Sequence, residues 1–140
     1  MTAGWELYDY CDAQGVNALK KWSVTLDSKE LSKLNAKLDL LSKNALLPPN
    51  LLVGPLRRFP HLYVLKVRGD VQIRVFLCKG PVDKNKEFTL LTTAIEKDRK
   101  YKPSNAWEIA EQLRITVEAN PKGRRRLHER VGKAAKTRIC

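Results

Sequence analysis

Hydrophobic residues recur along the first part of the chain at two spacings, which predict one strand followed by two helices. The stretch "WELYDY" (residues 5–10) places Trp5, Leu7 and Asp9 on one side, the alternation of a strand with one buried face. Helical spacing follows at Val16, Leu19, Trp22 and Leu26. A second helix begins at Asp27 or Ser28, because Asp27 and Glu30 form a capping box. Its apolar stripe comprises Leu31, Leu34, Leu38, Leu41 and Ala45.

The second half of the pattern predicts a hairpin, a further strand and a helix. A connection rich in proline and glycine (residues 46–60) leads into the hairpin "LYVLKVRGDVQIRVF" (residues 62–76). The strand "KEFTLLTTA" (residues 86–94) is followed by the charged loop "IEKDRKYKP". A helix then begins near Pro103 or Ser104 and ends at Asn120–Pro121, with Ala106, Ile109, Ala110, Leu113 and Val117 on its buried face. The order β-α-α-β-β-β-α predicts an α+β domain on a mostly antiparallel sheet.

The register of the hairpin decides which of its residues share a face. A three-residue loop, Gly69–Val71, pairs Val67 with Ile73, Leu65 with Val75 and Tyr63 with Leu77, so that each pair on one face is apolar. The other face then carries Lys66 opposite Arg74 and Arg68 opposite Gln72. Like charges that face each other destabilise a sheet. Two interpretations remain at this point: a solvated basic face, or a site that holds an anion.

Composition and charge narrow the class of protein. A chain of 140 residues that is 43% hydrophobic is long enough for one domain with its own core. The acidic start does not resemble a signal peptide, and no stretch approaches the length of a membrane span. Cys11, Cys78 and Cys140 are widely spaced without a CxxC motif, so we expect free thiols in the cytoplasm and no metal site. The net charge of +12 indicates a polyanionic partner.

The positive charge is concentrated at the C-terminus. Residues 121–140 contain eight Lys/Arg and one Glu, a net charge of +7, which leaves +5 for residues 1–120. We therefore expect a basic extension that is partly flexible until it binds something. It serves either as a solubilising terminus or as an arm for phosphates, with Arg124, Arg125, Arg126 and His128 nearest to the folded part.

These features together resemble the RelE/HigB-type toxins of bacterial toxin–antitoxin systems, in their phage-derived branch. The resemblance covers residues 5–120 and rests on the helical pair, the hairpin and the segment "FTLLTTAIEKDRKYKPSNAWEIAEQL". It implies a RelE-like fold, with two N-terminal helices on a mostly antiparallel four-stranded sheet and a C-terminal helix. It also implies a cytoplasmic mRNA endoribonuclease that acts on translating ribosomes and is silenced by an antitoxin of the helix-turn-helix, HigA-like type.

The residues can be compared with what metal-free RNA cleavage requires. The 2′-hydroxyl needs a base, the phosphorane-like transition state needs positive charge, and the leaving 5′-oxygen needs an acid. No Gly-rich phosphate loop, HExxH or GxSxG motif is present. The two histidines, His61 and His128, lie at opposite ends of the predicted sheet-and-helix module, which argues against a two-histidine ribonuclease. The resemblance aligns Lys66 and Arg74 with basic residues of the family. We expect nearby Arg68 and Arg74 to favour the neutral amine of Lys66, which acts as the base.

The remaining candidates lie in the charged loop, the last helix and the tail. The loop carries Lys97, Arg99, Lys100 and Lys102, and Tyr101 can stack on a base or donate a proton. Trp107 falls where several relatives carry a functional tyrosine. Two positions depart from the family pattern: Val64 replaces a basic residue, and Ile73 replaces the tyrosine of the return strand. Two other functions stay open: a ParE-like inhibitor of DNA gyrase and a non-catalytic nucleic-acid-binding phage protein. No cofactor is implied.

Overall fold

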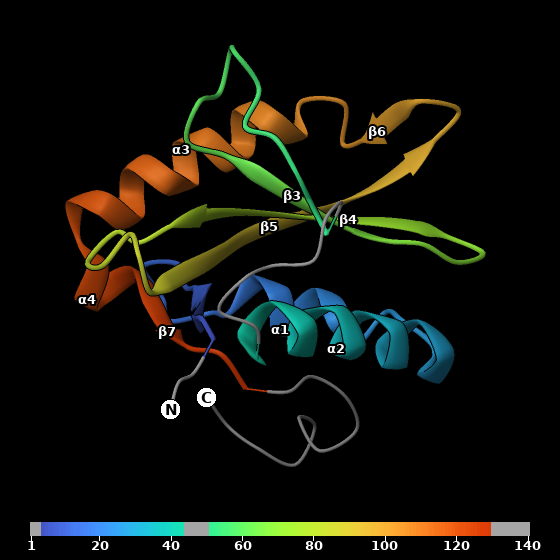
Figure 1. The fold of residues 1–140 in the computed structure, drawn as a ribbon, viewed down its shortest axis with the longest axis horizontal. Coiled ribbons are helices and arrows are strands. Elements are labelled where there is room, and N and C mark those ends of the chain that lie inside the picture. Colours follow the sequence, from blue (N-terminus) through green and yellow to red (C-terminus); the bar gives the residue numbers. More distant parts are fainter. Residues whose placement is uncertain (1–3, 44–50, 130–140) are drawn as a thin grey trace.

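The computed structural model describes residues 4–43 and 51–129, which form an α+β fold (Figure 1). Seven strands of this part of the chain belong to one mixed sheet. The strands are β1 (Glu6–Tyr10), β2 (Leu52–Val53), β3 (Tyr63–Val67), β4 (Gln72–Lys79), β5 (Glu87–Lys97), β6 (Lys100–Lys102) and β7 (Arg125–Leu127). The helices are α1 (Ala18–Ser23), α2 (Ser28–Lys43), α3 (Ala106–Ala119) and α4 (Pro121–Arg124).

The α+β class is confirmed, but the sheet is larger and less regular than predicted. The strand order is β2-β3-β4-β5-β1-β7, with β6 paired to β5 beside this path. β1 runs parallel to β5, whereas the other pairs are antiparallel. The three strands missing from the prediction, β2, β6 and β7, have only two or three residues each, too few to show an alternating pattern.

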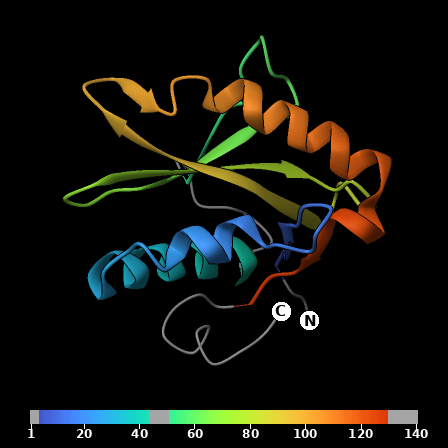
Figure 2. The same ribbon diagram turned by 180° about the vertical axis from the view of Figure 1, so that it is seen from behind.

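Helices cover both faces of the sheet, as the two opposite views show (Figures 1 and 2). α1 and α2 cover one face, where α2 inserts Leu34, Leu38 and Leu41 against β3, β4 and β5. The predicted capping box begins α2: the backbone N–H of Glu30 donates to Asp27 Oδ1 (2.7 Å), and that of Asp27 donates to Glu30 Oε1 (3.1 Å). α3 covers the other face with Ala106, Ala110 and Val117. The predicted stripe residue Ala45 lies outside the described residues.

The predicted hairpin register is confirmed, with Val67 opposite Ile73 and Lys66 opposite Arg74. A fully solvated basic face, one of the two interpretations of this second face, is wrong. Val64 and Phe76 share that face and are fully buried beneath α3, and Arg74 itself is only 5% exposed. The hairpin therefore contributes to the core on both of its faces, and the sequence pattern on one strand pair could not show that a later helix covers the second face.

The sheet continues beyond residue 120. Asn120 caps the short helix α4, and β7 then pairs antiparallel with β1, with Asp9 opposite Arg126. The backbone N–H of His128 donates to the carbonyl of Leu7 (2.9 Å) and extends this pairing. The start of the basic extension therefore folds as α4 and as strand β7 of the same sheet, and residues 130–140 lie outside the described part.

Candidate functional site

Polar residues gather on the α3 face of the sheet at the end that α3 leaves uncovered. On each of three strands, an apolar residue beneath α3 has a polar residue two positions away on the same face, toward this end of the sheet. The pairs are Val64 and Lys66 on β3, Phe76 and Arg74 on β4, and Ala94 and Glu96 on β5. Alternation of side chains places each pair on the same face. The strand pairing brings these polar residues to the same end of the sheet, because Lys66 is opposite Arg74, and Glu96 lies two residues beyond Ala94, which Arg74 faces. We call Lys66, Arg74, Glu96, Tyr101 and Trp107 the sheet-end site.

Arg74 is the most buried member of the sheet-end site. Its Nε donates to Glu96 Oε1 (2.7 Å), and its Nη1 donates to the carbonyl of Ile73 (3.0 Å). Its Nη2 makes no hydrogen bond within the described residues, yet that part of the chain holds no buried side-chain nitrogen or oxygen without a partner. Nη2 therefore reaches solvent. The negative charge of Glu96 offsets the positive charge of Arg74 beside Lys66, and Glu96 was not among the predicted site residues.

Aromatic residues form the wall of the sheet-end site beneath the start of α3. Tyr101 packs edge-on against Phe76 (5.7 Å between ring centroids), and Trp107 packs edge-on against the same ring (5.0 Å). Burial raises the pKa of Tyr101, and the nearby charge of Glu96 raises it further, whereas Arg74 and a hydrogen bond with Trp107 lower it. Tyr101 therefore keeps its proton at neutral pH and can act as a proton donor.

The charged loop is a tight hairpin that sends Tyr101 to one face of the sheet and its three lysines to the other. Asp98 and Arg99 both have positive φ angles (52° and 66°), as a two-residue type I′ turn requires. Tyr101 pairs with Glu96 and lies on the α3 face. Lys97 pairs with Lys100, and Lys102 pairs with Ile95, which packs on the α1–α2 side. The structure thus brings Tyr101 to Arg74, but it places Lys97, Lys100 and Lys102 on the opposite face.

Arg68 and Lys66 are the more accessible basic residues near the sheet-end site. Lys66 is partly buried at the end of β3, and Arg68 is exposed just beyond that strand. The predicted pairing of Arg68 with Gln72 lies outside the ladder, whose last pair is Val67 with Ile73. An exposed arginine at this position can contact a phosphate without losing a structural partner.

The C-terminal basic residues form a second cluster, distant from the sheet-end site. β7 is three strands from β4, about 14 Å at ordinary strand spacing. The side chain of Arg125 is only 7% exposed; it donates to Glu87 Oε1 (3.0 Å) and lies over the ring of Tyr8 (3.8 Å). His128 Nδ1 lies 2.8 Å from Asp9 Oδ1, and the other oxygen of Asp9 accepts a bond from Asn17 (2.8 Å).

These contacts give the C-terminal cluster a structural function. Both carboxylates, Asp9 and Glu87, are almost fully buried, so their basic partners hold β7 against the sheet. Arg126 is exposed and Arg124 is partly exposed, and these two remain available to a phosphate. Sequence reasoning identified Asp9 as a residue of the inner face, but nothing in the sequence indicated its partner 119 positions later.

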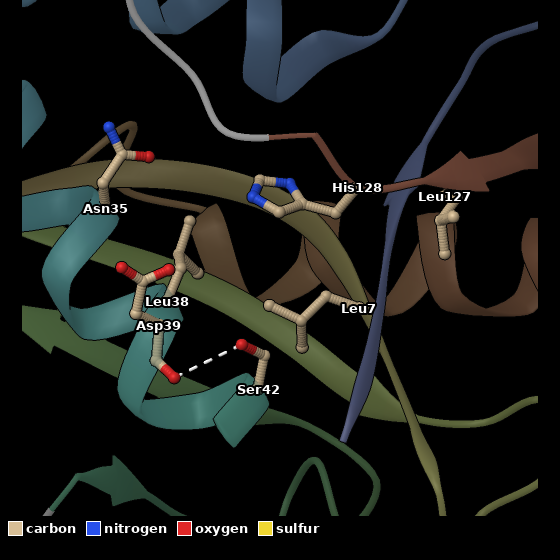
Figure 3. A pocket seen from close by; sticks show the side chains of 7 residues that line it. All are labelled: Leu7, Asn35, Leu38, Asp39, Ser42, Leu127 and His128. Carbon is tan, nitrogen blue, oxygen red and sulfur yellow. Dashed lines mark hydrogen bonds between the residues drawn. The ribbon is translucent and has the colours of Figure 1, made fainter. Parts of the chain in front are cut away.

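A pocket of about 310 Å³ adjoins the C-terminal cluster (Figure 3). The ring of His128 lies at its rim, above the apolar side chains of Leu7 and Leu38 (Figure 3). α2 contributes its polar wall with Asn35, Asp39 and Ser42, whose hydroxyl donates to the carbonyl of Asp39 (3.2 Å). No member of the sheet-end site lines this pocket.

Comparisons with known proteins do not identify a family, so a functional proposal rests on the residues and their geometry. No family model, curated protein or solved structure matches this chain. Within residues 4–43 and 51–129, no three His, Cys, Asp or Glu side chains gather in a way that could hold a metal ion. In the same residues, no helix has the length and apolar character needed to cross a membrane.

Proposed function

We propose that this protein is a metal-independent endoribonuclease of the RelE type, the toxin of a toxin–antitoxin pair. One observation carries the proposal: Lys66, Arg74 and Tyr101 come from three different strands and meet at an uncovered end of one sheet face. Cleavage of RNA by its own 2′-hydroxyl requires positive charge on the phosphate and a proton donor for the leaving oxygen. Lys66 and the Nη2 of Arg74 supply the charge, and Tyr101 supplies the proton.

The geometry also suggests how RNA is held. Trp107 is partly exposed beside Tyr101, so it offers a ring on which a base can stack. Arg68 and Arg99 are exposed near the sheet end and can contact the backbone on either side of the scissile phosphate. The net charge of +12 favours association with mRNA and with the RNA of the ribosome. We propose a helix-turn-helix antitoxin as the silencing partner.

A second candidate function is RNA binding without cleavage. The observation in its favour is the pairing of Arg74 with Glu96, since an arginine that is 5% exposed and already paired has less charge to offer a phosphate. A gyrase inhibitor of the ParE type has no specific contact in its favour, but the same purified protein can be tested for it.

The test is to incubate purified protein with labelled mRNA, with and without ribosomes and with EDTA present, and to map the new ends. We expect 2′,3′-cyclic phosphate and 5′-hydroxyl ends, which Lys66→Ala and Tyr101→Phe should reduce by about 10²-fold or more. Lys86→Ala and Tyr10→Phe serve as matched controls, because Lys86 is exposed and Tyr10 is partly buried on β1. RNA that is bound but intact would support the second candidate, and inhibition of DNA supercoiling without cleavage would indicate a gyrase inhibitor.

A further inference from the structure

We infer that Glu96 is the general base of the sheet-end site, a role that rests on the proposed ribonuclease function. Sequence reasoning assigned the base to Lys66 and gave Glu96 no role. In the structure the carboxylate of Glu96 is a partly exposed member of the sheet-end site. It accepts the Nε–H of Arg74 at 2.7 Å, and its strand partner on the same face is Tyr101.

The surroundings of Glu96 suit a base better than those of Lys66. The bond from Arg74 fixes the direction of the carboxylate, so that the second oxygen keeps its lone pairs for a substrate hydroxyl. The side chain is 26% exposed, which leaves it accessible to RNA. A lysine at neutral pH carries a proton and must lose it before it can accept another, whereas a glutamate carboxylate accepts one directly.

Glu96 and Tyr101 also divide the two proton transfers between them. Negative charge at Glu96 helps to keep the hydroxyl of Tyr101 protonated, so one side chain is ready to accept a proton while its neighbour is ready to donate one. Two neighbouring groups with opposite proton affinities are the arrangement that acid–base cleavage requires.

The reaction balances with these two groups and RNA alone. Glu96 takes the proton of the ribose 2′-hydroxyl while the bond from O2′ to phosphorus forms. The bond from phosphorus to O5′ breaks, and the leaving oxygen takes the proton of Tyr101. The products are a 2′,3′-cyclic phosphate and a 5′-hydroxyl, and exchange with water returns the protons of both side chains to their starting state. Lys66 and Arg74 stabilise the charge of the transition state throughout.

The experiment measures RNA affinity and single-turnover cleavage for two variants that separate the candidate bases. Glu96→Gln keeps an oxygen that accepts the bond from Arg74 but loses the base, so it should bind RNA at least as tightly as wild type and cut it about 10²- to 10⁴-fold more slowly. Lys66→Arg keeps the positive charge and removes the amine, and it should retain cleavage within about tenfold. Glu108→Gln is the matched control, because Glu108 is an exposed carboxylate on α3 that pairs with Arg58.

Each outcome decides the question. Cleavage by Glu96→Gln at the wild-type rate would overturn this inference and leave the ribonuclease proposal intact, and loss of cleavage in Lys66→Arg alone would return the role to Lys66. Wild-type protein that leaves RNA uncut would overturn both proposals.

If Glu96→Gln unfolds at a much lower temperature than wild type, the pH dependence of the wild-type cleavage rate distinguishes the two candidate bases. β4 places Arg74 against Glu96 and β6 places Tyr101 beside it, and Lys66 on β3 lies beyond Arg74, its strand partner. A rate that is constant down to about pH 5 and falls below it supports a carboxylate base, because carboxyl groups titrate in that range. A rate that already falls as the pH is lowered from 10 to 7 contradicts a carboxylate base and indicates an amine base.

Discussion

Replacement of Arg74 by alanine should destabilise the protein, contrary to what an open basic face would imply. The substitution removes a guanidinium that is 5% exposed and leaves Glu96 without its partner in the ion pair. Breaking a buried pair by removing one partner costs about 3–5 kcal/mol. Because the side chain of Glu96 is 26% exposed and water can solvate it, we expect the smaller value of about 2–3 kcal/mol.

This loss of stability is large enough to measure by thermal and urea denaturation. For a domain of 140 residues, each kcal/mol corresponds to about 3–5 °C in Tm, so the expected decrease is about 6–15 °C. Arg68→Ala is the matched control, because Arg68 is exposed beyond the same hairpin strand and its loss should change the free energy of unfolding by less than about 0.5 kcal/mol.

A double-mutant cycle with Glu96→Ala tests the cause of the destabilisation. Each single variant leaves one charge unpaired, whereas the double variant leaves none, so the double variant should lose about 1–3 kcal/mol less than the sum of the two. An Arg74→Ala protein that melts within 1 °C of wild type would refute the reasoning. It would mean that Arg74 is solvated and unpaired, and that its positive charge is fully available to RNA.

Three further predictions follow from particular contacts. Truncation after Asn120 removes β7 and deprives the buried carboxylates of Asp9 and Glu87 of their basic partners, so urea denaturation should show a large loss of stability; a truncated chain as stable as the full one would contradict the pairing of β7 with β1. Burial raises the pKa of Cys78 to about 12, so this thiol should react with iodoacetamide at pH 8 only after denaturation, as peptide mass spectrometry would show. The pKa of Tyr101 is higher in the folded protein than its ordinary value of about 10, so its protonated form stabilises the fold at lower pH and this stability is lost as the pH rises toward the folded pKa. Between pH 9 and 11, Tyr101→Phe should therefore lose less stability than wild type in urea denaturation, and equal losses would contradict this.

The sequence predicted those elements whose pattern is long enough to repeat. The stripe of α2 and its capping box, the alternation of β1 and the register of the hairpin all depend on local chemistry, and the structure confirms them. β7 could not be predicted in this way, because its three residues show no pattern and its position depends on Arg125 and His128 finding carboxylates more than 30 residues away.

The candidate site was predicted in part for a similar reason. Lys66, Arg74 and Tyr101 were selected, and the structure brings them together at one end of the sheet. Glu96 was missed because its importance depends on cross-strand register: it lies on the face of Arg74 only if Arg74 is opposite Ala94. Lys97, Lys100 and Lys102 were grouped with the site because they are close in sequence, although alternation along β5 and β6 sends them to the other face.

The position of the sheet-end site follows from a difference in length between α3 and the strands beneath it. A helix of 14 residues spans about 21 Å, whereas the eleven residues of β5 span about 36 Å, so α3 cannot cover the whole of that strand. Where the cover ends, water reaches the sheet, and β3, β4 and β5 all change there from an apolar to a charged residue on that face. Three separate segments of the sequence therefore make the same change at the same end of the sheet. Any polar residues at this end of the sheet would be enough to keep it solvated. Two cations, one carboxylate and a protonated tyrosine are a more specific set, and they are the charges and proton-transfer groups that the proposed cleavage of a phosphodiester would require.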